Sequence, residues 1–180
     1  IERLSMLGAN QKVNLSPDQI AGLTEVQGSI GHQEVAVTAS SIDLSALAFV
    51  SWGSRDLMVV SGTVDADTLT GSTRSDVLFG ADADDNLDGG DGTDTLSGGG
   101  GADILTGGLR ADAFLYQSLT DTGINEARDF IIDFAQGEDI IDISQMVTAS
   151  FIGNARFGGL GTAEIRYLQN AVRTEIQIDS

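Results

Sequence analysis

The amino-acid sequence predicts an all-β protein in which short strands stack in parallel coils and form a solenoid. Three observations favour this fold class. Residues 62–115 divide without a gap into nine-residue units, and apolar residues in the segment 1–61 recur at a spacing of 22. Residues 163–178 alternate apolar and polar side chains, as the two strands of a hairpin do. We therefore divide the 180 residues into an N-terminal region of stacked units (1–61), a repeat region (62–115) and a C-terminal region (116–180).

The composition excludes several classes of protein. The chain carries 27 acidic and 9 basic residues, a net charge of -18, which has the wrong sign for a nucleic-acid binder. Hydrophobic residues make up 41% of the chain, so it is not a disordered acidic tail. Cysteine is absent, which excludes disulfide bonds and thiolate metal sites. No apolar run approaches the ~20 residues that a membrane-spanning helix needs.

In the N-terminal region, the 22-residue spacing predicts stacked units of strand and helix. The residues that recur are Val13, Val35 and Leu57, then Leu15, Val37 and Val59, and then Ile20, Ile42 and Val64. The sequence after Leu15 predicts a short helix in which Ser16 is the N-cap, Pro17 is the first helical residue and Gln19 closes a capping box. An irregular β layer with accidental spacing is the alternative interpretation of this region.

The repeat region keeps its phase over six units, which a disordered Gly/Asp-rich tract has no reason to do. The first position is Gly62, Gly71, Gly80, Gly89, Gly98 and Gly107. The sixth position is Asp67, Asp76, Asp85, Asp94, Asp103 and Asp112. The eighth position is Leu69, Leu78, Leu87, Leu96, Leu105 and Phe114. Each unit therefore supplies one inward apolar side chain, on a short strand at its seventh to ninth positions.

Two such units make one coil of 18 residues, so turns that lie 18 residues apart stack on the same edge. Stacking predicts four neighbouring carboxylate pairs, which are Asp67 with Asp85, Asp85 with Asp103, Asp76 with Asp94, and Asp94 with Asp112. Glycine turns leave carbonyl oxygens pointing at a common centre, and carboxylates with carbonyls form the all-oxygen site that Ca²⁺ prefers. The repeat region holds eleven Asp against Arg74 and Arg110, a net charge of -9, so we expect folding to depend on the cation.

The units GGDGTDTLS and GGGGADILT resemble the G-G-x-G-x-D-x-U-x repeat of RTX (hemolysin-type) proteins, the calcium modules of type I secreted bacterial proteins. The resemblance implies a right-handed parallel β-roll with several Ca²⁺ ions between turns on both edges. The ligands that it implies in this region are Asp67, Asp76, Asp85, Gly89, Gly90, Gly92, Asp94, Gly98, Gly99, Gly101, Asp103, Gly107, Gly108 and Asp112.

Units one, two, three and six depart from the repeat. The second position is Thr63, Ser72 or Ala81, and the fourth is Asp65, Arg74, Ala83 or Arg110. Only residues 89–106 match throughout, so sites that use Asp94 and Asp103 have the best support and the site at Asp67 the least. We expect Arg74 and Arg110 to replace a cation in part by pairing with a neighbouring Asp.

The C-terminal region resembles the segment that follows the last repeat in serralysin-type secreted metalloproteases and in the R-modules of mannuronan epimerases. The matching residues are Asp112, Phe114, Asp129, Asp133, Phe134, Gly137, Asp139 and Asp142. The resemblance implies a further Ca²⁺ that joins this segment to the roll, with Asp121 and Asp129 as candidate ligands. The alternative is that these acids only solvate strand ends. We expect a C-terminal antiparallel cap, with a hairpin that turns at Gln169 and Asn170.

No catalytic constellation is recognisable in the sequence. His32 is the only histidine and lies outside an H-E-x-x-H sequence, and there is no G-x-S-x-G. We therefore predict a non-catalytic calcium-binding module of a larger secreted bacterial protein, which folds on Ca²⁺ after export and stabilises the parent protein. Its expected partners are the upstream domain and the type I secretion machinery, with no nucleic acid and no membrane span. The alternative is a calcium-dependent adhesin, surface-layer or polysaccharide-binding module at the cell surface, with polysaccharide or another copy as partner.

Overall fold

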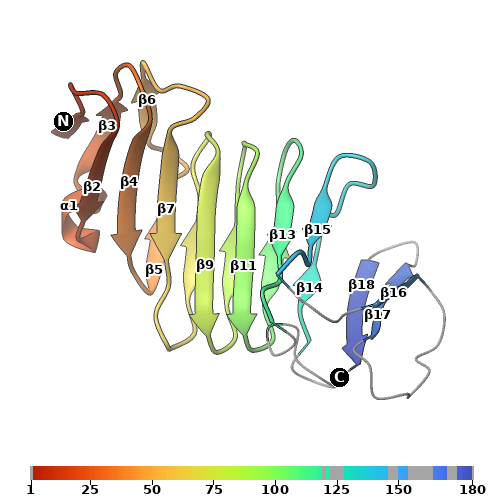
Figure 1. Cartoon of the computed structure of the whole chain (residues 1–180). Coiled ribbons are helices and arrows are strands. Elements are labelled where there is room, and N and C mark those ends of the chain that lie inside the picture. Colours follow the sequence, from red (N-terminus) through yellow and green to blue (C-terminus); the bar gives the residue numbers. More distant parts are fainter. Residues whose placement is uncertain are drawn as a thin grey trace.

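The computed structural model describes residues 2–118, 121, 128–145, 150–153, 164–169 and 174–179. These residues form a β-solenoid, drawn in Figure 1 as a row of parallel arrows from the N-terminal end to the C-terminal end. The one helix among them is α1 (Pro17–Ala21). No helix of the described residues is long and apolar enough to cross a membrane. The predicted fold class is confirmed.

Two long parallel sheets face each other across the solenoid. The larger has the order β15-β13-β11-β9-β7-β4-β2 and the smaller the order β14-β12-β10-β8-β5. The larger consists of β2 (Gln11–Leu15), β4 (Gln33–Thr38), β7 (Leu57–Ser61), β9 (Asp76–Asp82), β11 (Thr95–Gly100), β13 (Ala113–Leu115) and β15 (Ile140–Asp142). The smaller consists of β5 (Ser41–Asp43), β8 (Thr68–Thr70), β10 (Asn86–Asp88), β12 (Ile104–Thr106) and β14 (Phe130–Ile131). Each coil of the repeat region gives one strand to each sheet.

The core of the repeat region is a single stack of eighth-position side chains, as predicted. These residues are Leu69, Leu78, Leu87, Leu96, Leu105 and Phe114, and none is more than 1% exposed. Every unit has its strand at the predicted positions, although β9 and β11 continue into the following unit. Coils lie in register at 18 residues, since Val77 pairs with Thr95 and Asn86 pairs with Ile104.

After the repeats the coil becomes longer while the two sheets continue. Ile104 pairs with Phe130 and Ala113 pairs with Ile140, separations of 26 and 27 residues. The strands β14 and β15 therefore extend the parallel roll. The predicted hairpin follows, because β17 (Glu164–Gln169) is antiparallel to β18 (Thr174–Asp179). A further strand, β16 (Ser150–Gly153), is parallel to β17, and Asn170 lies outside the described residues.

In the N-terminal region the 22-residue spacing holds for one step and then fails. Val13 pairs with Val35 as predicted, but Val35 pairs with Met58, a separation of 23. Because successive residues of a strand point to opposite faces, one extra residue brings the neighbouring side chains inward. Met58 and Val60 are the fully buried residues of β7, so the prediction for Leu57 and Val59 is wrong.

The third predicted series is also wrong. Ile20 is buried in α1, whereas Ile42 belongs to β5 and pairs with Leu69, and Val64 is 71% exposed. The helix itself is as predicted, because the backbone N–H of Gln19 donates to Ser16 Oγ at 3.3 Å and the N–H of Ser16 donates to Gln19 Oε1 at 2.8 Å. The corresponding segment of the next coil is the strand β5, so α1 takes the place of a strand only at the N-terminal end.

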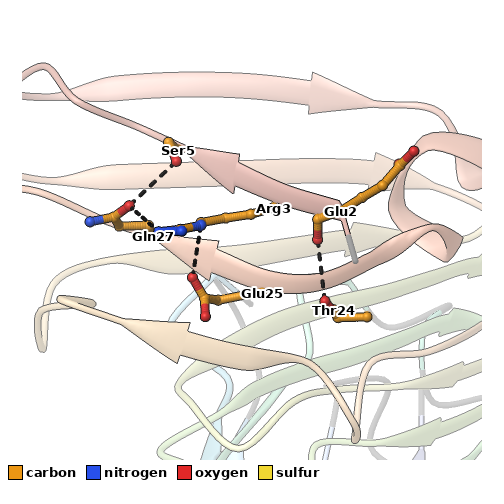
Figure 2. Close-up of polar contacts among 6 residues, drawn as sticks. All are labelled: Glu2, Arg3, Ser5, Thr24, Glu25 and Gln27. Atoms are coloured by element: carbon orange, nitrogen blue, oxygen red, sulfur yellow. Dashed lines mark hydrogen bonds and ion pairs between the residues drawn. The ribbon is translucent and has the colours of Figure 1, made fainter.

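A third parallel sheet, with the order β1-β3-β6, covers the N-terminal coils and contains β1 (Glu2–Ser5), β3 (Leu23–Gln27) and β6 (Ala48–Val50). Figure 2 shows how side chains join β1 to β3. Arg3 Nε lies 3.1 Å from Glu25 Oε1, and Arg3 Nη1 donates to Gln27 Oε1 at 3.0 Å. Ser5 Oγ donates to the same Gln27 oxygen at 3.4 Å. These contacts hold the first strand without any buried carboxylate.

The 23-residue step gives a test of the register. Met58→Ala is expected to lower the free energy of unfolding by about 2–5 kcal/mol, because it leaves a cavity in a fully buried position. Leu57→Ala, one residue away on the half-buried outer face, is expected to cost at most about 1 kcal/mol. Urea unfolding of both variants measures the difference. Equal losses, or a larger loss for Leu57→Ala, would contradict the register described here.

Candidate metal sites along the stacked turns

The sixth-position aspartates line the turns on the two edges of the roll. All six are buried, with at most 3% of each residue exposed. The columns are Asp67, Asp85 and Asp103 on one edge and Asp76, Asp94 and Asp112 on the other. A buried carboxylate is costly unless both of its oxygens have partners, so the partners of each oxygen decide what the turn requires.

One oxygen of each interior aspartate is satisfied by the preceding coil. The backbone N–H of Asp67 donates to Asp85 Oδ1 at 2.8 Å, and the N–H of Asp85 donates to Asp103 Oδ1 at 2.8 Å. On the other edge, the N–H of Asp76 donates to Asp94 Oδ1 at 2.8 Å, and the N–H of Asp94 donates to Asp112 Oδ1 at 2.9 Å. The structure thus brings together all four carboxylate pairs that the spacing predicts.

Each column continues by one coil beyond the repeats. The N–H of Asp103 donates to Asp129 Oδ1 at 3.0 Å, and the N–H of Asp112 donates to Asp139 Oδ1 at 2.9 Å. Asp129 is one of the candidates from the sequence, but Asp139 is not. The signal for Asp139 was present, because it lies 27 residues, or three units of nine, after Asp112.

The other candidate, Asp121, lies beside the column rather than in it. Its Oδ2 accepts from the backbone N–H groups of Gln117 at 2.8 Å and Ser118 at 2.9 Å. Its charge acts on Asp103, and together with Asp129 and Asp103 it acts on the buried Tyr116, whose hydroxyl lies beside the Asp129 carboxyl group. Burial, reinforced by these carboxylates, raises the pKa of Tyr116 well above its usual value. The structure therefore brings Asp103, Asp121 and Asp129 into one neighbourhood.

The second oxygen of five aspartates has no partner among the described residues. These buried atoms are Oδ2 of Asp85, Asp94, Asp103, Asp112 and Asp129. An unpaired buried carboxylate oxygen is among the most costly groups that a fold can contain. Its repetition along both edges indicates a ligand that the polypeptide does not supply.

The pKa values of these aspartates reflect the same free-energy cost of burying a charged carboxylate. Burial is the largest cause that raises the pKa of Asp94 and of Asp129 to about 8, and the charges of neighbouring aspartates add to it. Burial likewise raises the pKa of Asp85 and of Asp112 to about 6. Burial therefore disfavours the charged form of each carboxyl group when no cation is bound, most of all at Asp94 and Asp129.

Carbonyl oxygens converge on the unpaired carboxylate oxygens. A Cβ placed on Gly80 would lie 2.1 Å from Asp85 Oδ2 and 2.4 Å from the carbonyl oxygen of Gly98 in the next coil. A Cβ on Gly89 would lie 2.6 Å from Asp94 Oδ2 and 2.7 Å from the carbonyl oxygen of Gly107. The first four first-position glycines, Gly62, Gly71, Gly80 and Gly89, therefore each leave open a small space between the aspartate of their own unit and a carbonyl of the next coil.

All eight glycines predicted as site residues lie too close to a neighbouring oxygen to accept a side chain. At each, an added Cβ would come within 2.7 Å of a carboxylate or backbone oxygen, and they are Gly89, Gly90, Gly92, Gly98, Gly99, Gly101, Gly107 and Gly108. Gly99 and Gly108 also have φ of +101° and +99°, which L side chains rarely adopt. The turns therefore need glycine both for their conformation and for the approach of the next coil.

The donor set fits Ca²⁺. Every converging atom is an oxygen, and hard cations such as Ca²⁺ prefer carboxylate and carbonyl oxygens. Within the part of the chain that the structure describes, no group of three or more His, Cys, Asp or Glu side chains is placed to hold a metal ion. A cation in these turns must therefore take most of its ligands from backbone carbonyls.

The expectation that arginines replace a cation is wrong for the described residues. The ion pairs found among them are Arg3 with Glu25 and Lys12 with Glu34, and Arg74 and Arg110 are exposed and pair with no carboxylate there. Arg110 instead has φ of +92° at a position where glycine is usual, and the residue is exposed.

Comparison with known proteins places this fold in a family. A search of curated proteins finds no match. The family model described as "Peptidase M10 serralysin C terminal" matches residues 3–180. That family is the C-terminal part of serralysin and not its peptidase domain. The repeats, the β-solenoid and a match over nearly all of its length agree, and the chain belongs to the serralysin C-terminal family.

Proposed function

We propose that this chain is a non-catalytic calcium-binding module of a larger secreted protein. The observation that carries the proposal is the set of five buried carboxylate oxygens without a partner, repeated along both edges of the roll. The residues that would hold the ions are Asp85, Asp94, Asp103, Asp112 and Asp129, with the carbonyl oxygens of Gly98 and Gly107 beside Asp85 and Asp94.

Bound Ca²⁺ would supply the positive charge that the columns lack and would link adjacent coils. The carboxylates must be deprotonated to bind it, so binding opposes the raised pKa values of the metal-free turns. Each unit of the repeat region buries only one apolar side chain, and the region carries a net charge of -9, eleven Asp less two Arg. Ion binding and folding of this region are therefore coupled.

Weak affinity would connect calcium to export. Extracellular calcium modules typically bind with Kd of about 10⁻⁴ to 10⁻³ M, so such sites are empty in the cytosol and filled outside the cell. The turns of the repeat region that need calcium would stay unfolded while the chain passes through the type I secretion machinery and would fold on arrival. The folded roll would then stabilise the upstream domain of the parent protein. The family match supports a secreted protein of this kind.

Calcium-coupled folding is tested by circular dichroism. In EGTA the β signal of the protein is expected to fall, because the open turns of the repeat region lack their cation, and a few millimolar Ca²⁺ should restore it cooperatively. The same concentration of Mg²⁺ should restore little, because its octahedral preference and firmly held waters suit a carbonyl-rich site poorly. A spectrum and a melting temperature that do not respond to EGTA would contradict both the calcium sites and the export hypothesis.

A further inference from the structure

The turns of the roll are of two kinds, which differ in the second oxygen of the aspartate. At Asp67, Oδ2 accepts from the backbone N–H of Thr63 at 2.6 Å, and Oδ1 accepts from Thr63 Oγ1 at 3.1 Å. At Asp76, Oδ2 accepts from the N–H of Ser72 at 2.6 Å, and Oδ1 accepts from Ser72 Oγ at 3.1 Å. We call these closed turns, because both oxygens of the carboxylate accept hydrogen bonds, Oδ2 from a backbone N–H within the turn.

The turns that follow are open. In the units of Asp85, Asp94, Asp103 and Asp112, Oδ2 has no donor. The difference lies in the second residue of the unit. In the open turns this residue has positive φ, with values of +98° at Ala81, +91° at Gly90, +101° at Gly99 and +99° at Gly108. Thr63 and Ser72 are not among the residues with positive φ.

A change in the sign of φ at the second residue reverses the peptide plane between the first and second residues. In the closed turns the N–H of that peptide points at the carboxylate. In the open turns the reversal removes the N–H. The first-position carbonyl of the next coil lies beside the carboxylate in both kinds of turn, as Gly80 does at Asp67 and Gly98 at Asp85, so the two kinds differ in the N–H and not in the carbonyl. One peptide plane therefore decides whether a carboxylate is satisfied by the backbone or needs a cation.

Three closed turns precede the open ones at the N-terminal end of the roll, and Asp139, beyond the last repeat, is closed as well, because its Oδ2 accepts from the N–H of Ala135 at 2.7 Å. Asp56, which is 1% exposed, accepts from the N–H of Gln33 at 2.8 Å and from the N–H of Gly53 at 2.6 Å. Asp56, Asp67 and Asp76 are thus all closed before the first open turn, which is that of Asp85. The N-terminal coils also bury a larger apolar core, with Met6, Val26, Val35, Val37, Met58 and Val60 each at most 3% exposed.

We propose that the roll consists of a calcium-independent part, residues 2–79, and a calcium-dependent part that begins at Gly80. In the first part the N–H groups of Thr63 and Ser72 take the place of the cation, so Asp67 and Asp76 bind none. The folded edge formed by β8 and the first residues of β9, with the last closed turn, then serves as the template on which calcium adds the following coils. This proposal rests on the calcium-binding function proposed above and adds the position along the chain at which the calcium sites begin.

Hydrogen exchange with mass spectrometry tests the division in the full chain. In EGTA, peptides from residues 33–61 are expected to remain protected, while peptides from 80–115 exchange freely. Millimolar Ca²⁺ should protect the second group and change the first little. Free exchange of both groups in EGTA would overturn the division and leave calcium binding intact. Protection of 80–115 without calcium would instead contradict the calcium-binding function.

Two matched variants on the same edge of the roll test the assignment of residues. Asp94→Asn should lower the number of Ca²⁺ ions bound per chain in isothermal titration, because it removes an unpaired charged oxygen. Asp76→Asn should leave that number unchanged, because the Ser72 hydroxyl can turn to accept from the new amide while the Ser72 N–H still donates. An equal loss of bound Ca²⁺ in both variants would overturn the proposal.

Discussion

Gly99→Ala is expected to destabilise the calcium-bound protein by several kcal/mol, whereas Gly100→Ala at the next residue should have little effect. Gly99 has φ of +101°, and a left-handed conformation costs an L residue roughly 1–2 kcal/mol. Its new Cβ would also lie 2.0 Å from the carbonyl oxygen of Ala81. Because that oxygen belongs to the stacked turn of the preceding coil, relief requires the coils to move apart, and overpacking of this kind adds about 1–3 kcal/mol.

Gly100 is the matched control. A Cβ there would have its nearest neighbour at 3.7 Å, Asp82 Oδ1, which is an ordinary contact distance. Urea unfolding of both variants at saturating Ca²⁺ measures the two changes in the free energy of unfolding. If the two substitutions cost the same, the close stacking of turns described here is wrong.

Acidification is expected to increase the β structure of the calcium-free protein. In the unfolded chain an aspartate titrates near pH 4, but in the folded roll burial raises the pKa of Asp85 and Asp112 to about 6 and that of Asp94 and Asp129 to about 8. The fold therefore binds protons more tightly than the unfolded chain does. The resulting stability is fully present below about pH 4 and is lost as the pH rises through 6 to 8.

Circular dichroism of protein freed of calcium by dialysis, at pH 8.5 and at pH 5, measures this effect. At pH 5 the buried carboxyl groups are protonated while most exposed acids stay charged, so the β signal should rise. Saturating Ca²⁺ should reverse the dependence, because protons then compete with the cation for the same oxygens. Asp94→Asn is the control and should show a weaker pH response. A calcium-free spectrum that is the same at both pH values, or that loses β signal at pH 5, would contradict the prediction.

The repeat region could be predicted from the sequence because its period includes the turns. Each nine-residue unit contains one strand, one inward side chain and one turn. The period alone therefore predicts that Leu78 pairs with Leu96. The N-terminal coils lack this property. Their coils include loop residues that do not recur at a fixed spacing, so the sequence does not give the length of each coil. One extra residue before Met58 was enough to change which side chains of β7 are buried. The coil that ends at Asp129 became longer for the same reason.

The positions of the aspartates were predictable, but the partners of their oxygens were not. Thr63, Ser72 and Ala81 all depart from glycine at the second position, and the sequence treats them alike. In the structure, Thr63 and Ser72 form closed turns, whereas Ala81 adopts φ of +98° and leaves its turn open. The hydroxyls of Thr63 and Ser72, which Ala81 lacks, donate to the carboxylate and accept from the N–H two residues on, and this difference is the signal that the sequence analysis did not use.

The alternation of units between two sheets limits how such a protein can change in length over evolution. Removing one unit of nine residues would move every later strand to the opposite sheet and exchange the two edges of the roll. Removing or duplicating 18 residues, such as 80–97, would keep each later strand in its own sheet and each later turn on its own edge. A gene duplication that lengthens the roll would therefore keep the existing pairing only if it added units in pairs. Each pair adds two buried carboxylates, so a longer roll comes with a greater demand for calcium.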